Sequence, residues 1–139
     1  CINEDGEKER IVMLHVAVMG SIERFASILI EHYAGAFPLW LSPEQVRILP
    51  IADRHLDFVE EVKEQLLANG VRVEVDAKAE RLPAKIRSAQ MEKVPHMLVI
   101  GDKEVEAKQV NVRFQNGEQK SFGVEKYVAE VLKVIAEKS

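Results

Sequence analysis

Apolar residues along the chain form two kinds of pattern, short unbroken runs and sets with helical spacing. Residues 10–19 form a nearly unbroken apolar run with several β-branched side chains, which predicts a strand buried on both faces. After Gly20 and Ser21, apolar residues recur at helical spacing as far as Tyr33. We therefore expect a strand followed by a helix that ends near Gly35.

Residues 36–43 interrupt this pattern. Pro38 and Pro43 lie in this segment and prevent a regular helix, so it is expected to be a fairly stiff connector. We place a domain boundary here, with residues 1–42 in one unit and residues 43–139 in the other.

Beyond the connector, strand and helix patterns alternate. Asn116 and Gly117 form the strongest short signal of a β-hairpin, and residues 101–106 are expected to form a charged loop after a buried strand. The order β-α-β-α-β-β-β-α indicates an α/β fold, in which a mixed, mainly parallel five-stranded sheet is covered by helices. The expected strands cover residues 46–50, 71–75, 96–100, 109–114 and 118–122, and the expected helices cover residues 54–69, 82–92 and a last stretch from residue 124.

Composition narrows the choice of function without deciding it. The net charge is −4 and the isoelectric point is near 5.6, which excludes the broad basic character of a general nucleic-acid-binding protein. Residues 43–139 contain sixteen basic and seventeen acidic side chains, so any RNA contact must use locally placed cations. No apolar run is long enough to cross a bilayer, and a single cysteine fits a reducing compartment. We therefore expect a cytoplasmic protein with no membrane partner.

Catalytic and metal-binding motifs are not apparent. The four histidines lack metal-ligand spacing, no glycine-rich phosphate loop follows a strand, and no nucleophile elbow is present.

Two stretches are nevertheless candidates for ligand binding. Arg24 lies in the first turn of the first expected helix, from which its guanidinium can reach a triphosphate; the alternative is a surface arginine paired with Glu23 or Glu31. Residues 101–106, with Arg113 on the following strand, lie beyond the carboxyl end of a buried strand, where open α/β sheets usually bind ligands. The alternative there is an ordinary charged loop.

Five segments, taken together, are specific enough to suggest a family. The order and spacing of these segments resemble the threonyl-tRNA synthetase family of class II aminoacyl-tRNA synthetases. The resemblance implies that the first unit is the end of a catalytic domain, consisting of a third-motif strand and helix plus the connector. It implies that the second unit is a tRNA anticodon-binding domain with a three-layer α/β/α fold, whose partner is the anticodon stem-loop of threonine tRNA. The segments are residues 15–25, 30–43, 85–87, 93–106 and 110–113.

The resemblance also assigns two residues of the first unit. Arg24 matches the ATP-binding arginine of the third class II motif, and His15 matches one of three zinc ligands. Val16 departs from the family, which usually has arginine there. The parent family uses ATP, magnesium and zinc, but the other two zinc ligands and the first two motifs belong to segments that this sequence lacks. Since a zinc site needs at least three protein ligands, we expect no metal, no cofactor and no amino-acid activation here.

In the second unit, the family's anticodon-contacting positions fall on Arg81, Lys93, Glu104 and Arg113, whereas Ala79 stands where asparagine is usual. A carboxylate can accept hydrogen bonds from exposed base edges, and an arginine offers a two-pronged donor. Arg81 and Lys93 can add charge for phosphates. Ala79 offers neither donor nor acceptor, so some base discrimination is expected to be lost.

Two other interpretations stay open. The chain is either a synthetase-like accessory domain that binds other RNA or a protein, or an excised or engineered α/β scaffold with little RNA binding. In each case residues 10–35 must cover apolar surface, so they are expected to pack back on the second unit or to mediate self-association.

Overall fold

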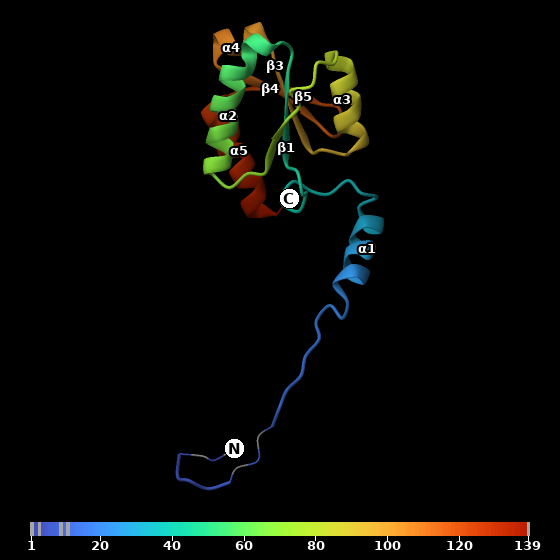
Figure 1. Cartoon of the computed structure of the whole chain (residues 1–139), viewed down its shortest axis with the longest axis vertical. Helices are drawn as coiled ribbons and strands as arrows, with labels where there is room; N and C mark the ends of the chain where they lie inside the picture. Colours follow the sequence, from blue (N-terminus) through green and yellow to red (C-terminus); the bar gives the residue numbers. More distant parts are fainter. Residues whose placement is uncertain (1, 3, 9, 11, 139) are drawn as a thin grey trace.

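The computed structural model describes residues 2, 4–8, 10 and 12–138, and its centre is a five-stranded sheet (Figure 1). The order across the sheet is β2-β1-β3-β4-β5, with β1 parallel to β2 and β3, and β4 antiparallel to β3 and β5. Four strands therefore point in one direction and β4 in the other, which confirms the mixed, mainly parallel sheet. The strands are β1 (Val46–Pro50), β2 (Val73–Val75), β3 (His96–Ile100), β4 (Gln109–Phe114) and β5 (Gln119–Gly123).

Helices cover both faces of this sheet, so the predicted three-layer α/β/α architecture is confirmed. α2 (Leu56–Ala68) and α5 (Val124–Glu137) lie on one face, and α3 (Leu82–Met91) lies on the other (Figure 1). A 3-10 turn (Asp53–His55) precedes α2. Apart from the two corrections below, the predicted elements agree with the structure to within two residues.

Side chains of β1 and β3 alternate between two separate cores. The larger core, between the sheet and α2 with α5, contains Ile48 and Leu98 together with Tyr127 of α5. The smaller core, between the sheet and α3, contains Leu49 and Met97. Because α3 packs on β1 and β3, it covers only part of its face of the sheet.

The segment expected to be a loop is a short helix, α4 (Asp102–Ala107), so the loop prediction was wrong. Glu104 turns back to accept a hydrogen bond from the Gly101 N–H at 3.0 Å, which stabilises the first turn as a capping residue does. Val105 packs against the larger core, and Lys108 ends the helix in the left-handed conformation. A helix of six residues is too short for apolar spacing to reveal.

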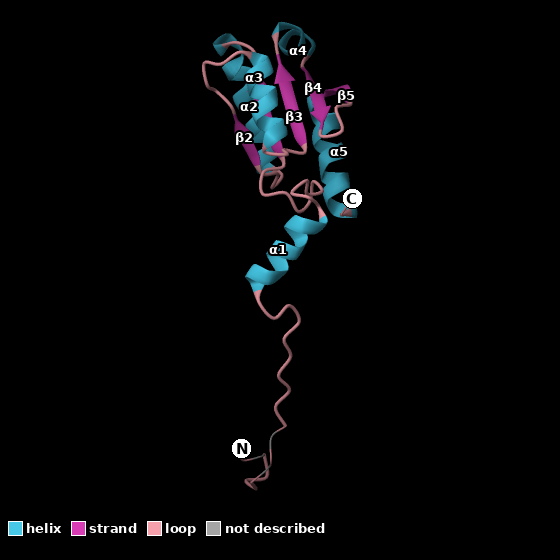
Figure 2. Ribbon diagram, turned by 90° about the vertical axis from the view of Figure 1, so that its right-hand side faces the viewer, coloured by secondary structure: helices cyan, strands magenta, loops and turns pink. Residues whose placement is uncertain are grey.

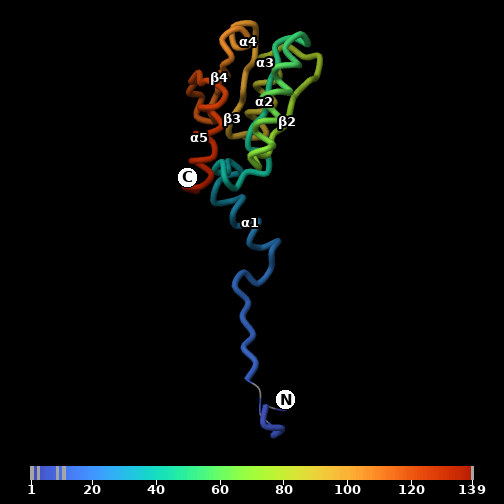
Figure 3. Tube along the Cα trace, turned by 90° about the vertical axis from the view of Figure 1, so that its left-hand side faces the viewer, coloured from blue at the N-terminus to red at the C-terminus, as the bar shows by residue number. Residues whose placement is uncertain are grey.

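In the first unit the predicted helix is present but the predicted strand is not. α1 (Ile22–His32) forms as expected, but residues 12–19 form no strand and their side chains are exposed, with Leu14 87% accessible. The strand prediction was wrong because a strand needs a hydrogen-bonded neighbour, and the five strands of the sheet pair only with one another. Residues 12–19 and α1 extend away from the sheet (Figure 3). In the part of the chain described, no helix has the length and apolar character to cross a bilayer.

The connector is fixed to the sheet domain. Leu39 is buried in the larger core, and the buried Gln45 side chain donates to the Leu39 carbonyl at 2.8 Å. The guanidinium of Arg72 donates to the carbonyls of Trp40 (3.0 Å) and Ser42 (2.7 Å). The domain boundary at residue 42 stays a prediction, but packing against the sheet begins before it.

Candidate nucleic-acid interface

The carboxyl ends of β1 and β3 meet at one edge of the sheet, and two predicted site residues lie there. β1 leads into the turn before α2, whereas β3 leads into α4 (Figure 2). Open α/β sheets commonly bind ligands where neighbouring strands send their connections apart. Arg81 is the residue that caps α3 at this edge, and Glu104 lies in the first turn of α4.

A charged network holds the start of α4. Asp102 accepts hydrogen bonds from Arg54 Nε (2.8 Å) and Arg54 Nη2 (2.5 Å) and lies 2.9 Å from Nε2 of the buried His55. Hydrogen bonds hold the pKa of the Asp102 carboxyl well below its usual value, and the bond with Arg54 has a larger effect than the bond with His55. Sequence reasoning missed this network because its members are 47 and 48 residues apart, with no local signal that joins them.

Glu104 is half-buried, and its two oxygens have different surroundings. Oε2 accepts from the Gly101 N–H. Among the described residues, Oε1 has no hydrogen-bond partner and is left to accept from a ligand. The backbone bond therefore orients the carboxylate without using its full accepting capacity.

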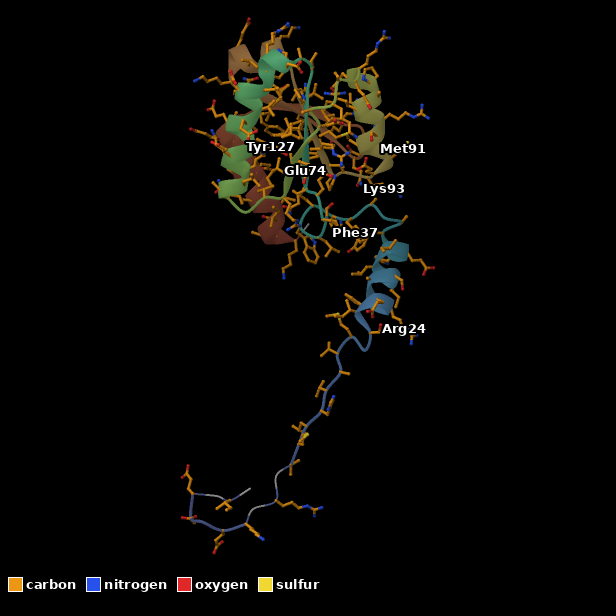
Figure 4. All side chains as sticks on the ribbon, viewed as in Figure 1. Arg24, Phe37, Glu74, Met91, Lys93 and Tyr127 are labelled. Atoms are coloured by element: carbon orange, nitrogen blue, oxygen red, sulfur yellow. The ribbon has the colours of Figure 1, made fainter. Side chains whose placement is uncertain are left out.

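The other two predicted residues lie toward the opposite end of β3. Lys93 lies two residues after α3 (Figure 4), and its Nζ donates to the carbonyl of Ala34, which lies between α1 and the connector. Its own carbonyl accepts from the Gln115 side chain at 2.8 Å. Arg113 on β4 is opposite Met97 in the antiparallel register.

The structure therefore divides the four predicted contacts into two pairs rather than one cluster. The three-residue step from Met97 to the end of β3 at Ile100 separates the pairs along the strand, a distance of about 10 Å. Three stacked nucleotides advance by about the same amount, roughly 3.4 Å each. The two pairs thus lie at different positions along β3.

Arg113 has an unusual electrostatic situation. Its side chain is half-buried, and its Nε is buried with no hydrogen-bond partner among the described residues. A buried donor without an acceptor is costly, by about 1–3 kcal/mol, and such groups are rare in folded proteins. The terminal Nη groups of Arg113 also have no protein acceptor among the described residues and can donate to an external one, whereas the buried Nε is reached only if the side chain moves.

The candidates of the first unit lie outside this interface. His15 and Val16 are exposed in the extended segment, and Arg24 is exposed in the first turn of α1 (Figure 4). The Glu23 carboxylate accepts from the Ser21 hydroxyl at 2.6 Å, and no ion pair joins Arg24 to Glu23 or Glu31 in the described part. Across the described residues, no group of three potential ligands is placed to hold a metal ion.

Ala79 lies exposed in the loop between β2 and α3, two residues before Arg81.

The hollows of the protein surface lie mostly away from the four predicted contact residues. One of about 400 Å³ is lined by Phe58 and Lys108, and one of about 560 Å³ by Arg47 and Glu74. Lys93 lines a hollow of about 250 Å³ beside Gly35 and Pro43. The other predicted contacts form an open surface, which suits an extended polymer better than a small molecule.

Comparisons with known proteins agree on one kind of domain. A family model described as "Anticodon binding domain" matches residues 45–138. Threonine–tRNA ligase of Clostridioides difficile is 53% identical over 135 residues, which are 96% of this chain and 21% of that protein. Threonine–tRNA ligase of Deinococcus radiodurans is 56% identical over 115 residues, 83% of this chain and 18% of that protein. The chain therefore spans about a fifth of the length of these relatives.

Solved structures give the same picture. The RNA binding domain of threonyl-tRNA synthetase from Cryptosporidium parvum superposes with a TM-score of 0.80 at 30% identity, covering 85% of this chain and 30% of that one. Prolyl-tRNA synthetase from the same organism has a TM-score of 0.66 at 23% identity, covering 72% of this chain and 23% of that one, which shows a shared fold.

Proposed function

The chain belongs to the anticodon-binding domain family, in the form found in threonine–tRNA ligases, and on this premise we propose that it binds the anticodon loop of a threonine tRNA. The guanidinium of Arg113 carries the proposal, because none of its donors, the buried Nε included, has an acceptor among the described residues. Neither the fold nor the relatives support the alternative of an engineered scaffold. A cytoplasmic location, where translation takes place, follows from the same proposal.

The proposed contacts are of two kinds, hydrogen bonds to base edges and charge interactions with phosphates. Unpaired anticodon bases expose their Watson–Crick edges. Arg113 donates to base acceptors through its fork, and the free Oε1 of Glu104 accepts from a base amino or imino group. Arg81 contributes positive charge for a phosphate at the carboxyl edge of the sheet. Lys93 contributes charge at the other end, beside the connector.

The order of these groups fits a triplet. Arg113 and Glu104 face different nucleotides, because Arg113 is opposite Met97 whereas Glu104 follows Ile100, which is about 10 Å farther along the strand. Each reads a separate base. Orientation comes from the sheet and from the network around Asp102, which fixes α4 before RNA arrives. A site held in advance loses less entropy on binding than one that must be ordered.

The proposal is tested by titrating the chain with a fluorescent threonine tRNA anticodon stem-loop and with a loop of scrambled sequence. We expect saturable binding that favours the threonine loop, and a loss of about ten- to a hundredfold for Arg113→Ala, since hydrogen bonds to charged groups contribute about 1.5–3 kcal/mol. Lys120→Ala, on the opposite face of the sheet, is the charge-matched control. Equal affinity for both loops, or equal affinity of wild type and Arg113→Ala, would refute the proposal.

We further propose that residues 10–35 mediate self-association. The exposed apolar side chains of residues 12–19 and of α1 support this, among them Phe25 and Ile28, because contiguous apolar surface of this kind usually marks a contact. Sedimentation velocity should show a concentration-dependent dimer that Phe25→Glu dissociates. A monomer at every concentration would contradict this second proposal and leave the first untouched.

A further inference from the structure

One face of the β4–β5 hairpin is polar and has no helix over it. Val110 and Val112 of β4 and Phe122 of β5 point into the larger core. The alternate residues therefore project from the opposite face, on which α3 covers β1 and β3. In Figure 2, which shows the α3 side, β4 and β5 are seen beside α3 rather than beneath it. Apart from Gln109 and Gly123 at the far end of the hairpin, the residues on this open face are Asn111, Arg113, Gln119 and Ser121.

The register arranges these four side chains as two adjacent pairs. Arg113 is opposite Gln119, and Asn111 is opposite Ser121. The neighbouring Phe114 N–H donates to the Glu118 carbonyl at 2.9 Å, so Phe114 forms a hydrogen-bonded pair and the next pair inward does not. In such non-hydrogen-bonded pairs the Cα atoms are only about 4.5 Å apart and the side chains stand closest together.

All four side chains retain hydrogen-bonding capacity. Within the described part of the chain, none of them has a side-chain hydrogen bond to the protein, and the buried Nε of Arg113 is itself unpartnered. Asn111 is half-buried beside Val99 of β3, whereas Gln119 and Ser121 are exposed. Such a concentration of free donors and acceptors on a rigid sheet is typical of a binding surface.

The chemistry of this face matches a base edge rather than a phosphate chain. These four residues supply two amides, a hydroxyl and a single cation, with no carboxylate, and Gln109 adds a third amide at the far end of the face. Neutralising phosphates requires several cations, whereas the amide of asparagine or glutamine pairs its C=O and NH₂ with complementary groups on a base. The exposed bases of a single-stranded loop present such groups.

We propose that Asn111, Gln119 and Ser121 act with Arg113 as a reading surface for one unpaired base of the bound RNA, and that Gln119 is a specificity-determining residue. The proposal rests on the proposed function and names contacts beyond those that the sequence indicates. Gln119 donates to or accepts from the base that Arg113 contacts, because the two side chains are direct cross-strand neighbours. Asn111 and Ser121 continue the surface toward the middle of the sheet.

The first test is the affinity of Gln119→Ala and Asn111→Ala for the threonine tRNA anticodon stem-loop, measured by fluorescence anisotropy. Each variant should bind about three- to tenfold more weakly, the effect of one neutral hydrogen bond, with an unchanged salt dependence because no charge is removed. The control is Lys120→Ala, which changes the adjacent residue on the core-facing side of β5. It should bind with less than a twofold loss, although simple charge attraction predicts the reverse order.

Base specificity provides a readout that a structural role would not affect. Each anticodon base is replaced in turn, and the loss caused by Gln119→Ala should disappear for one replacement only, as in a double-mutant cycle. The side-chain NH₂ signals of Asn111 and Gln119 should shift in an NMR titration, while that of Asn69, which caps α2, should not. Unfolding midpoints of the variants establish that they are folded.

The outcomes separate this inference from the function on which it rests. If wild type prefers the threonine loop and Arg113→Ala weakens binding, but Gln119→Ala and Asn111→Ala bind like wild type, the reading surface is wrong and the proposed function stands. If wild type has no loop preference, both are wrong. Equal losses for Gln119→Ala against every base replacement would show a general contact and overturn the specificity role.

Discussion

The buried amide of Gln45 offers a sharp test of how the connector is held. The side chain is 1% accessible; its Nε2 donates to the Leu39 carbonyl at 2.8 Å and its Oε1 accepts from the Arg72 N–H at 2.9 Å. The Gln45→Leu substitution keeps a similar volume but leaves both backbone groups buried without these partners. Each unsatisfied group costs about 1–3 kcal/mol, so we expect the free energy of unfolding to fall by about 2–4 kcal/mol.

Urea denaturation followed by two probes measures this loss. Far-ultraviolet circular dichroism reports the sheet domain, and the fluorescence of Trp40, the single tryptophan, reports the connector. The matched control is Gln65→Leu on α2, whose half-buried amide has no side-chain hydrogen bond among the described residues and whose replacement should change stability by about 0.5 kcal/mol or less. Coincident transitions in wild type would show that connector and sheet unfold together. Equal midpoints for the two variants would refute the reasoning.

Three further predictions concern titration and the interface. Burial lowers the pKa of His96 from 6.5 to about 4, so the unfolded state binds the proton first as the pH falls. The free energy of unfolding should therefore drop by up to about 3 kcal/mol between pH 6.5 and pH 4. His96→Gln should remove this pH dependence in urea titrations at each pH, and an unchanged pH dependence would assign it to another group. Hydrogen bonds from Arg54 first, and from His55, lower the pKa of Asp102 in the folded state below its ordinary value of 3.8. The stabilisation that this gives is complete above 3.8 and is lost progressively as the pH falls from there through the folded-state pKa. Asp102→Asn should therefore lower the urea midpoint more at pH 6 than at pH 2, and equal losses at the two pH values would contradict this assignment. Ala79→Asn restores an amide beside Arg81 and should tighten binding of the threonine anticodon loop by about three- to tenfold in the anisotropy assay, with no gain for the scrambled loop; a gain for both would indicate a non-specific effect.

Elements that carry their own local signal were predictable from the sequence. The strands at residues 46–50 and 96–100 agree with β1 and β3 residue for residue, because short apolar runs bounded by polar segments have few alternatives. The hairpin followed from Asn116 and Gly117, since Gly117 adopts a φ of 86° that other residues rarely accept. In these strands and in the hairpin turn, the residues of the element itself determine its conformation.

Features that depend on distant partners were not predictable. The run at residues 10–19 has the composition of a buried strand, but composition does not supply the neighbouring strand it needs. α4 depends on Arg54 and Glu104 at its first turn, and its six residues show no period. Alternation along β4 places Arg113 on a polar face of the sheet, and this could be predicted. That no helix covers this face depends on where α3 packs, and no single segment of the sequence determines that position.

The hydrogen bond between Lys93 and the Ala34 carbonyl has a geometric consequence for any complex with RNA. An ammonium group has three donors, so Lys93 can keep Ala34 and take a phosphate oxygen as well. Two acceptors that share one nitrogen lie within about 6 Å of each other. A phosphate held by Lys93 is thereby brought against the residues that link α1 to the connector, and the segment that precedes the sheet domain becomes a neighbour of the nucleic acid.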